Sequence, residues 1–77
     1  MINFSRHAKR RMRLYDITEE DVKFVVESGK REISSDGKLN IIQEIEGRYK
    51  YPIKIIGIEK KESLLILTAY PLKKRRG

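Results

Sequence analysis

Residues 52–71, which read PIKIIGIEKKESLLILTAYP, decide the fold. Isoleucine and leucine are frequent both before and after the polar segment at residues 59–62. This pattern is typical of two strands that are buried on both faces and joined by a turn. Pro52 marks where the first strand starts and Pro71 stops the second, because proline is not tolerated inside a ladder of hydrogen bonds. We therefore predict a central strand that begins after Pro52 and a last strand over residues 64–70.

Two shorter strands are expected before this pair. Residues 31–35 contain one main apolar residue, Ile33, which indicates an edge strand. The dipeptide Asp36-Gly37 is a strong signal for a hairpin turn, and residues 40–46 follow it with isoleucines on both faces. Together with the last pair, these segments predict an antiparallel meander of about four strands.

Two helices are expected before the strands. The first runs from Arg6 to about Tyr15, because Ser5 is a good N-cap and neither glycine nor proline interrupts the following residues. The second begins after Thr18, has three acidic residues in its first turn, and ends at Gly29 as a C′ residue. Both helices are short, so their stability must come from packing against the strands.

The order of these elements predicts one α+β domain over residues 1–72, with the two N-terminal helices packed on one face of the antiparallel meander. Residues 2–4 alternate apolar and polar, so they form either a very short strand or a hydrophobic contact in front of the first helix. Residues 73–77 are a basic C-terminal tail. A chain of 77 residues has room for one modest core.

Composition narrows the chemistry that is available. The chain has no cysteine and one histidine, which excludes disulfides and thiolate chemistry and argues against a structural zinc site. No metal or cofactor is therefore expected. No segment resembles a signal peptide or is long enough to span a bilayer, so we expect a cytoplasmic protein that does not contact membranes. Eleven isoleucines and a single glutamine suggest a thermophilic source.

The net charge of +7 is concentrated at the two ends of the chain. Residues 1–13 carry five basic side chains and no acidic one, and residues 73–76 carry four more. The middle of the chain contains the remaining nine basic residues and all eleven acidic ones, so its net charge is −2. A polyanion such as RNA is the natural partner of such ends. The predicted RNA-binding residues are Arg6, Lys9, Arg10, Arg13, Lys73, Lys74, Arg75 and Arg76.

The residues that could perform chemistry suit cleavage of RNA without a metal. A 2′-hydroxyl can attack its own phosphate if one group takes a proton, another donates one, and cations stabilise the pentacoordinate phosphorus. We assign His7 as general acid or base, Arg11 and Arg10 as phosphate clamps, and Tyr70 as a positioning group. Alternatively, His7 is a capping or packing histidine, Tyr70 is an ordinary sheet residue, and the arginines are merely solvated.

The chain resembles a widespread family of small domains of unknown function over residues 4–71. This family is grouped with the RelE/ParE toxin superfamily and is similar in layout to BrnT-type toxins. The resemblance implies a RelE-like α+β domain with an antiparallel sheet, and a metal-free ribonuclease toxin that an antitoxin protein counteracts. The residues that carry it are His7-Ala8-x-x-Arg11-Met12, Ile17, Asp21-Val22, Gly29 and Leu67-Thr68-Ala69-Tyr70-Pro71.

By position, His7 and Arg11 match the histidine and arginine of that family, and Thr68 and Tyr70 match its last-strand motif. Members often have an arginine where this chain has Tyr15. We therefore expect a toxin-type RNA-binding domain that acts as a metal-independent endoribonuclease, with RNA, including ribosome-bound mRNA, and a cognate antitoxin as partners. The alternatives are a non-catalytic nucleic-acid-binding module and a structural or protein-interaction domain that uses the predicted edge strand.

Overall fold

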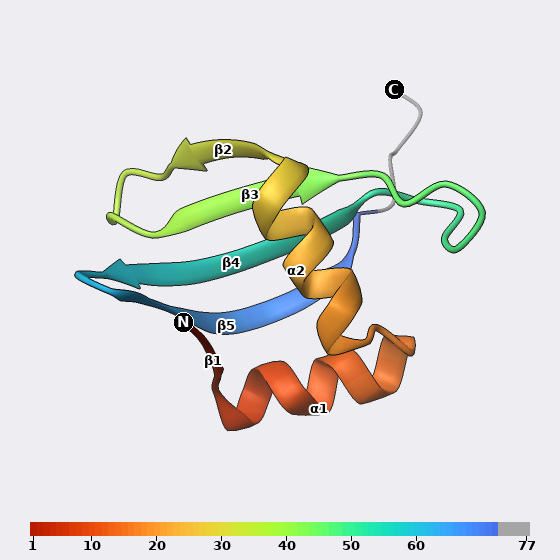
Figure 1. Cartoon of the computed structure of the whole chain (residues 1–77), viewed down its shortest axis with the longest axis horizontal. Coiled ribbons are helices and arrows are strands. Elements are labelled where there is room, and N and C mark those ends of the chain that lie inside the picture. Colours follow the sequence, from red (N-terminus) through yellow and green to blue (C-terminus); the bar gives the residue numbers. More distant parts are fainter. Residues whose placement is uncertain (73–77) are drawn as a thin grey trace.

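The computed structural model describes residues 1–72, which form an α+β fold (Figure 1). Both predicted helices are present, and the first has the predicted bounds. The strands differ from prediction by one to three residues at their ends. In chain order the elements are β1 (Ile2–Phe4), α1 (Arg6–Tyr15), α2 (Glu19–Ser28), β2 (Lys30–Ile33), β3 (Leu39–Gln43), β4 (Ile53–Lys60) and β5 (Ser63–Pro71).

The sheet has five strands in the order β1-β5-β4-β3-β2, and it is mixed. Strands β2 to β5 form the predicted antiparallel meander, with β2 at one edge and β4 in the interior. The prediction of a wholly antiparallel sheet of about four strands was wrong, because β1 pairs with β5 in parallel. Three residues carry too little pattern to indicate the direction of their pairing, and their partner lies about 60 residues further along the chain.

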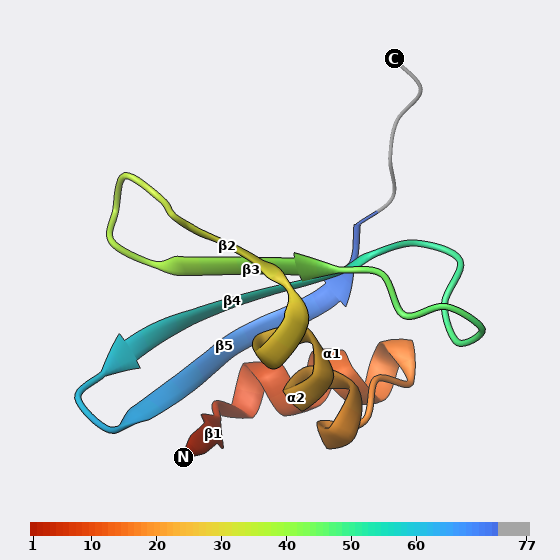
Figure 2. The same cartoon turned by 45° about the horizontal axis from the view of Figure 1, so that its top comes forward.

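The core is one cluster of buried side chains from both helices and the sheet. In the views of Figures 1 and 2, α2 lies across the strands and α1 runs alongside β5, which it contacts. Alternate residues of β4 are buried and half-exposed, so one face of the sheet meets the core. The buried members are Ala8, Met12, Ile17, Val22, Val25, Val26, Leu39, Ile41, Ile53, Ile55, Leu64, Ile66 and Ala69.

The start of α1 is fixed to β5 through Ser5. Its N–H donates to the carbonyl of Ile66 (3.0 Å), and its hydroxyl donates to the carbonyl of Leu67 (3.1 Å) while accepting from the N–H of Ala8 (3.0 Å). Leu67 lies at an irregularity where the register between β4 and β5 shifts. The predicted N-cap is therefore confirmed, and this irregularity positions the first turn of α1.

The two helices end in different ways. Asp16, in the left-handed region at φ 58°, ends α1, and the N–H of Ile17 reaches back to the carbonyl of Met12 (2.8 Å). Gly29 follows α2 as predicted, but its φ of −79° needs no glycine. The reason for glycine is space, since a Cβ there would lie 2.6 Å from Cγ2 of Ile41 and 2.6 Å from the carbonyl oxygen of Val25.

Neither of the helices in residues 1–72 has the length and hydropathy needed to cross a membrane.

Candidate nucleic-acid interface

Helix α1 presents a cluster of exposed basic side chains, which we call the α1 cationic surface: Arg6, Lys9, Arg10 and Arg13. The first turn of the helix contains no acidic residue. Within residues 1–72, the ion pairs involve basic residues of other elements, and none of these four side chains lies within 4.0 Å of a carboxylate. The surface is therefore a concentration of positive charge without internal compensation.

This concentration of charge is unfavourable for the helix itself, because cations near a helix N-terminus oppose its dipole. Packing holds α1 in place in spite of this unfavourable interaction with the helix dipole. Ala8 is fully buried and Met12 is 7% exposed, and both belong to the common core. The Ser5 cap and the bonds to β5 add to this anchoring. The helix is thus a rigid support for charges that only an external anion can neutralise.

His7, Arg11 and Tyr15 occupy successive turns along one side of α1, at a spacing of four residues. His7 is exposed, so the alternative of a packing histidine is wrong. Arg11 is half-buried, and its Nη1 donates to the hydroxyl of Tyr15 at 3.4 Å. Tyr15 therefore orients the guanidinium of Arg11, and the imidazole of His7 remains accessible to a ligand.

Tyr70 comes from the far end of β5 and is half-buried. Its partner across the sheet is Lys54 of β4, and these two side chains lie on the face opposite the buried residues Ile55 and Ala69. Among residues 1–72, no hydrogen bond joins Tyr70 to His7 or Arg11. The structure places His7 and Arg11 on α1, which packs into the core, and Tyr70 on the opposite face of the sheet, so it does not bring the three predicted catalytic residues together. Four predicted RNA-binding residues, Lys73, Lys74, Arg75 and Arg76, lie outside the described part of the chain.

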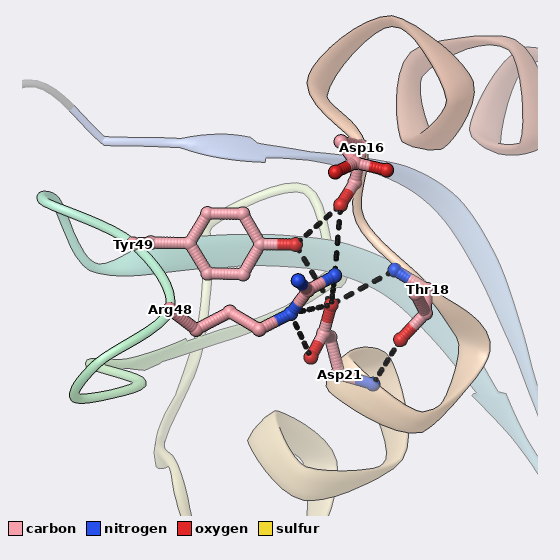
Figure 3. Close-up of polar contacts among 5 residues, drawn as sticks. All are labelled: Asp16, Thr18, Asp21, Arg48 and Tyr49. Carbon is pink, nitrogen blue, oxygen red and sulfur yellow. Dashed lines mark hydrogen bonds and ion pairs between the residues drawn. The ribbon is translucent and has the colours of Figure 1, made fainter.

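A second polar cluster, which the sequence analysis missed, joins loop 44–52 to the corner between the helices (Figure 3). Its centre is Asp21, a buried residue of α2. The carboxylate accepts from Nη2 of Arg48 (2.9 Å), from the hydroxyl of Tyr49 (2.7 Å) and from the N–H of Thr18 (2.9 Å). The same arginine and tyrosine also donate to the carbonyl of Asp16, at 3.1 and 2.6 Å. We call these contacts the Asp21 anchor.

The pKa values of the groups in the Asp21 anchor indicate a structural role for it. Burial alone would raise the pKa of Asp21, but the hydrogen bonds from Arg48, Thr18 and Tyr49 outweigh burial and hold the pKa below its usual range. Burial and the neighbouring carboxylate raise the pKa of Tyr49 to about 12. Neither group exchanges a proton near neutral pH. The only sequence signal was the capping spacing from Thr18 to Asp21, and nothing indicated Arg48, 27 residues further on.

Two grooves flank β1, and neither contains the predicted catalytic residues. One, of about 630 Å³, is lined by β1 and by Glu19, Lys23 and Glu27 of α2. The other, of about 260 Å³, lies between β1 and the turn from β4 to β5. Their walls mix both signs of charge, which does not suit a polyanion. Residues 1–72 also contain no group of three His, Asp or Glu side chains placed to hold a metal ion.

Comparison with known proteins agrees with the extent of this fold. A family model described as "Domain of unknown function (DUF4258)" matches residues 4–71, from the end of β1 to the end of β5. The chain belongs to this family. No curated protein and no solved structure gives a significant match. The DUF4258 description names no activity.

Proposed function

We propose that this DUF4258 domain is a toxin-type RNA-binding protein whose α1 cationic surface contacts phosphates. The observation that carries the proposal is the set of four exposed basic side chains on an anchored helix, none of them paired with a carboxylate of residues 1–72. A solvated helix of ordinary composition mixes both signs of charge on its exposed face.

Binding to phosphates would relieve the electrostatic cost of α1. Each phosphate that a basic side chain neutralises releases condensed counterions, so affinity for a single strand falls with salt at a slope of about −0.7 per contact. Arginine supplies three of the four side chains of the surface, and its planar fork matches phosphate oxygens better than lysine does. We expect about three or four phosphate contacts from α1 alone.

Cleavage of the bound RNA is a second candidate function, favoured by the exposure of His7 one turn before Arg11. In this mechanism the 2′-oxygen attacks the adjacent phosphorus and the bond from phosphorus to the 5′-oxygen breaks, which leaves a 2′,3′-cyclic phosphate and a 5′-hydroxyl. His7 takes the proton of the 2′-hydroxyl or supplies one to the leaving 5′-oxygen, and water accepts or donates the other proton. Arg11, held by Tyr15, stabilises charge on the phosphorane.

The toxin assignment adds a protein partner and a RelE-like layout to this proposal. Two helices that share one core with a sheet agree with that layout. An antitoxin would cover the α1 cationic surface with an acidic segment and so compete with RNA. An interaction through β2 is the structural alternative, because all four of its residues are exposed and it pairs on one side only, with β3.

The proposal is tested by fluorescence anisotropy with a labelled single-stranded RNA at several salt concentrations. The double variant Arg10→Ala/Arg13→Ala should weaken binding about tenfold or more at low salt and flatten the salt slope by about 1.4, which is two contacts at 0.7 each. The matched control is Lys60→Ala/Lys61→Ala, which removes the same charge from the turn between β4 and β5. Equal losses in both variants, or affinity that does not change with salt, would refute binding by α1.

A further inference from the structure

The four tyrosines of the chain come from segments that lie at one end of the molecule. This end comprises the last residue of α1, loop 44–52, and the end of β5 (Figure 1). Two hydrogen bonds join these segments: the hydroxyl of Tyr49 donates to Asp16 directly after α1, and the N–H of Leu72 donates to the carbonyl of Pro52 (2.7 Å). Segments that are far apart in the sequence and carry tyrosines are thus joined at this end.

Two of the four tyrosines are structural. Tyr15 and Tyr49 pack against the buried core, and their hydroxyls are engaged with Arg11 and with the Asp21 anchor respectively. The other two, Tyr51 and Tyr70, are half-exposed and are not part of the packing around that core. Their hydroxyls have no hydrogen-bond partner within residues 1–72. Half-exposed rings without a structural partner are available to a ligand.

Each of these two available rings is accompanied by a lysine. Nζ of Lys50 lies 6.0 Å from the centroid of the Tyr51 ring. Lys54 is the cross-strand neighbour of Tyr70, on the same face of the sheet. An aromatic ring beside a cation is the combination that single-stranded nucleic acids require, because the ring stacks on a base and the cation meets the adjoining phosphate.

We propose that Tyr51 and Tyr70, with Lys50 and Lys54, form a stacking surface for unpaired bases. This inference rests on the proposed function and narrows its substrate class to single-stranded RNA. In a duplex each base is already stacked between its neighbours, so the two rings can engage only bases that are free. The α1 cationic surface binds the backbone in any sequence, and the stacking surface selects strands with accessible bases.

The stacking surface is held in place before any ligand arrives. Gly47, at φ 79°, permits the turn in loop 44–52, and the Asp21 anchor binds the middle of this loop to the helices. Tyr51 then precedes the first residue of β4 by two positions, and β4 carries Lys54. A preorganised loop loses less conformational entropy on binding, which is the physical role that we assign to the anchor in recognition.

The experiment compares two labelled decamers of equal charge in anisotropy titrations: a single strand of A and C, and the same backbone with abasic sites. Wild-type protein should bind the strand with bases more tightly. Tyr51→Ala and Tyr70→Ala should each weaken that binding about tenfold and leave the abasic strand unaffected, whereas the Phe variants should retain it. Phe24→Ala is the matched control, since Phe24 is an exposed aromatic residue of α2. Circular dichroism checks that each variant is folded.

A spectroscopic readout accompanies the titrations. The chain has no tryptophan, so tyrosines dominate its emission, and stacking on bases should quench them in the wild type and less in Tyr51→Ala/Tyr70→Ala. Equal affinity for the two decamers, or unchanged affinity in the double variant, would overturn the stacking surface while leaving binding by α1 intact. Binding of neither decamer would refute the proposed function itself.

Discussion

Replacement of Asp21 by asparagine tests the Asp21 anchor most directly. The variant keeps the shape of the side chain and one oxygen that can accept from the N–H of Thr18. It loses the charge that Arg48 and the hydroxyl of Tyr49 contact. If its oxygen takes the place of Oδ2, which accepts from Thr18, Tyr49 and Nη2 of Arg48, its amide N–H₂ takes the place of Oδ1 and faces the donor Nε of Arg48. The loop 44–52 should therefore lose its main attachment to the helices.

The size of the effect follows from burial. Removing one partner of a fully buried ion pair costs about 3–5 kcal/mol. The Asp21 side chain is 10% exposed and that of Arg48 is 39% exposed. Water can therefore solvate the guanidinium of Arg48 and replace part of the lost ion pair. We therefore expect the free energy of unfolding to fall by about 2 kcal/mol, or the Tm by about 8–16 °C for a domain of this size.

The pH dependence gives a second measure of the same effect. The pKa of Asp21 is lowered in the folded protein, so near pH 4 the unfolded chain binds a proton that the folded one does not. The stabilisation by this carboxylate is complete above about pH 5 and is lost as the pH falls toward the folded pKa. The difference between wild type and Asp21→Asn should therefore shrink on acidification.

Urea denaturation followed by circular dichroism at pH 7 and at pH 3 measures both quantities. The control is Glu20→Gln, an exposed neighbour in the same first turn of α2, which should change stability little. If Asp21→Asn and Glu20→Gln were equally stable at pH 7, or if the Asp21→Asn difference were the same at both pH values, the Asp21 anchor would not stabilise the fold as reasoned.

Three further outcomes are expected. Gly29→Ala should lower the free energy of unfolding by about 1–3 kcal/mol in urea titrations, because its Cβ would meet Ile41 and a backbone carbonyl; a neutral result would contradict the close approach. Tyr49, with its pKa raised to about 12, should ionise well above the ordinary tyrosine pKa of about 10 in an absorbance titration, and the stability that its hydroxyl provides should disappear between about pH 10 and 12; Tyr49→Phe should abolish the step near pH 12. His7→Ala should lower the rate of RNA cleavage about 10²- to 10⁴-fold. The circular dichroism spectrum should not change, because the side chain is exposed. Cleavage at the wild-type rate would exclude His7 from the mechanism.

Features that depend on neighbouring residues could be predicted from the sequence. The helix starts at Ser5 and Thr18 follow from hydrogen bonds that span three residues, and the hairpin at Asp36-Gly37 follows from turn chemistry. The basic character of α1 could also be predicted, because residues 1–13 contain no acidic residue. These features are local, so sequence pattern and physical cause coincide.

Features that depend on distant residues could not be predicted. The parallel pairing of β1, the irregularity of β5 at Leu67, and the bond from Arg48 to Asp21 each join segments that no periodicity connects. Gly29 shows a subtler limit, since its presence was recognised but its reason, the nearness of Ile41, exists only in the packed structure. For the candidate site, the sequence indicated which residues are basic, and the fold determined which tyrosines remain available.

The pairing of β1 with β5 also has a consequence for how the domain assembles. Contacts between Met1 and Glu62, 61 residues apart, can form only after nearly the whole chain has been brought together, and such distant contacts slow folding because the entropy of the closed loop is lost first. Helix α1 depends on the same closure, since its cap is bonded to Ile66 and Leu67. A partly folded chain therefore has no ordered α1 cationic surface, and this surface forms together with the completed sheet.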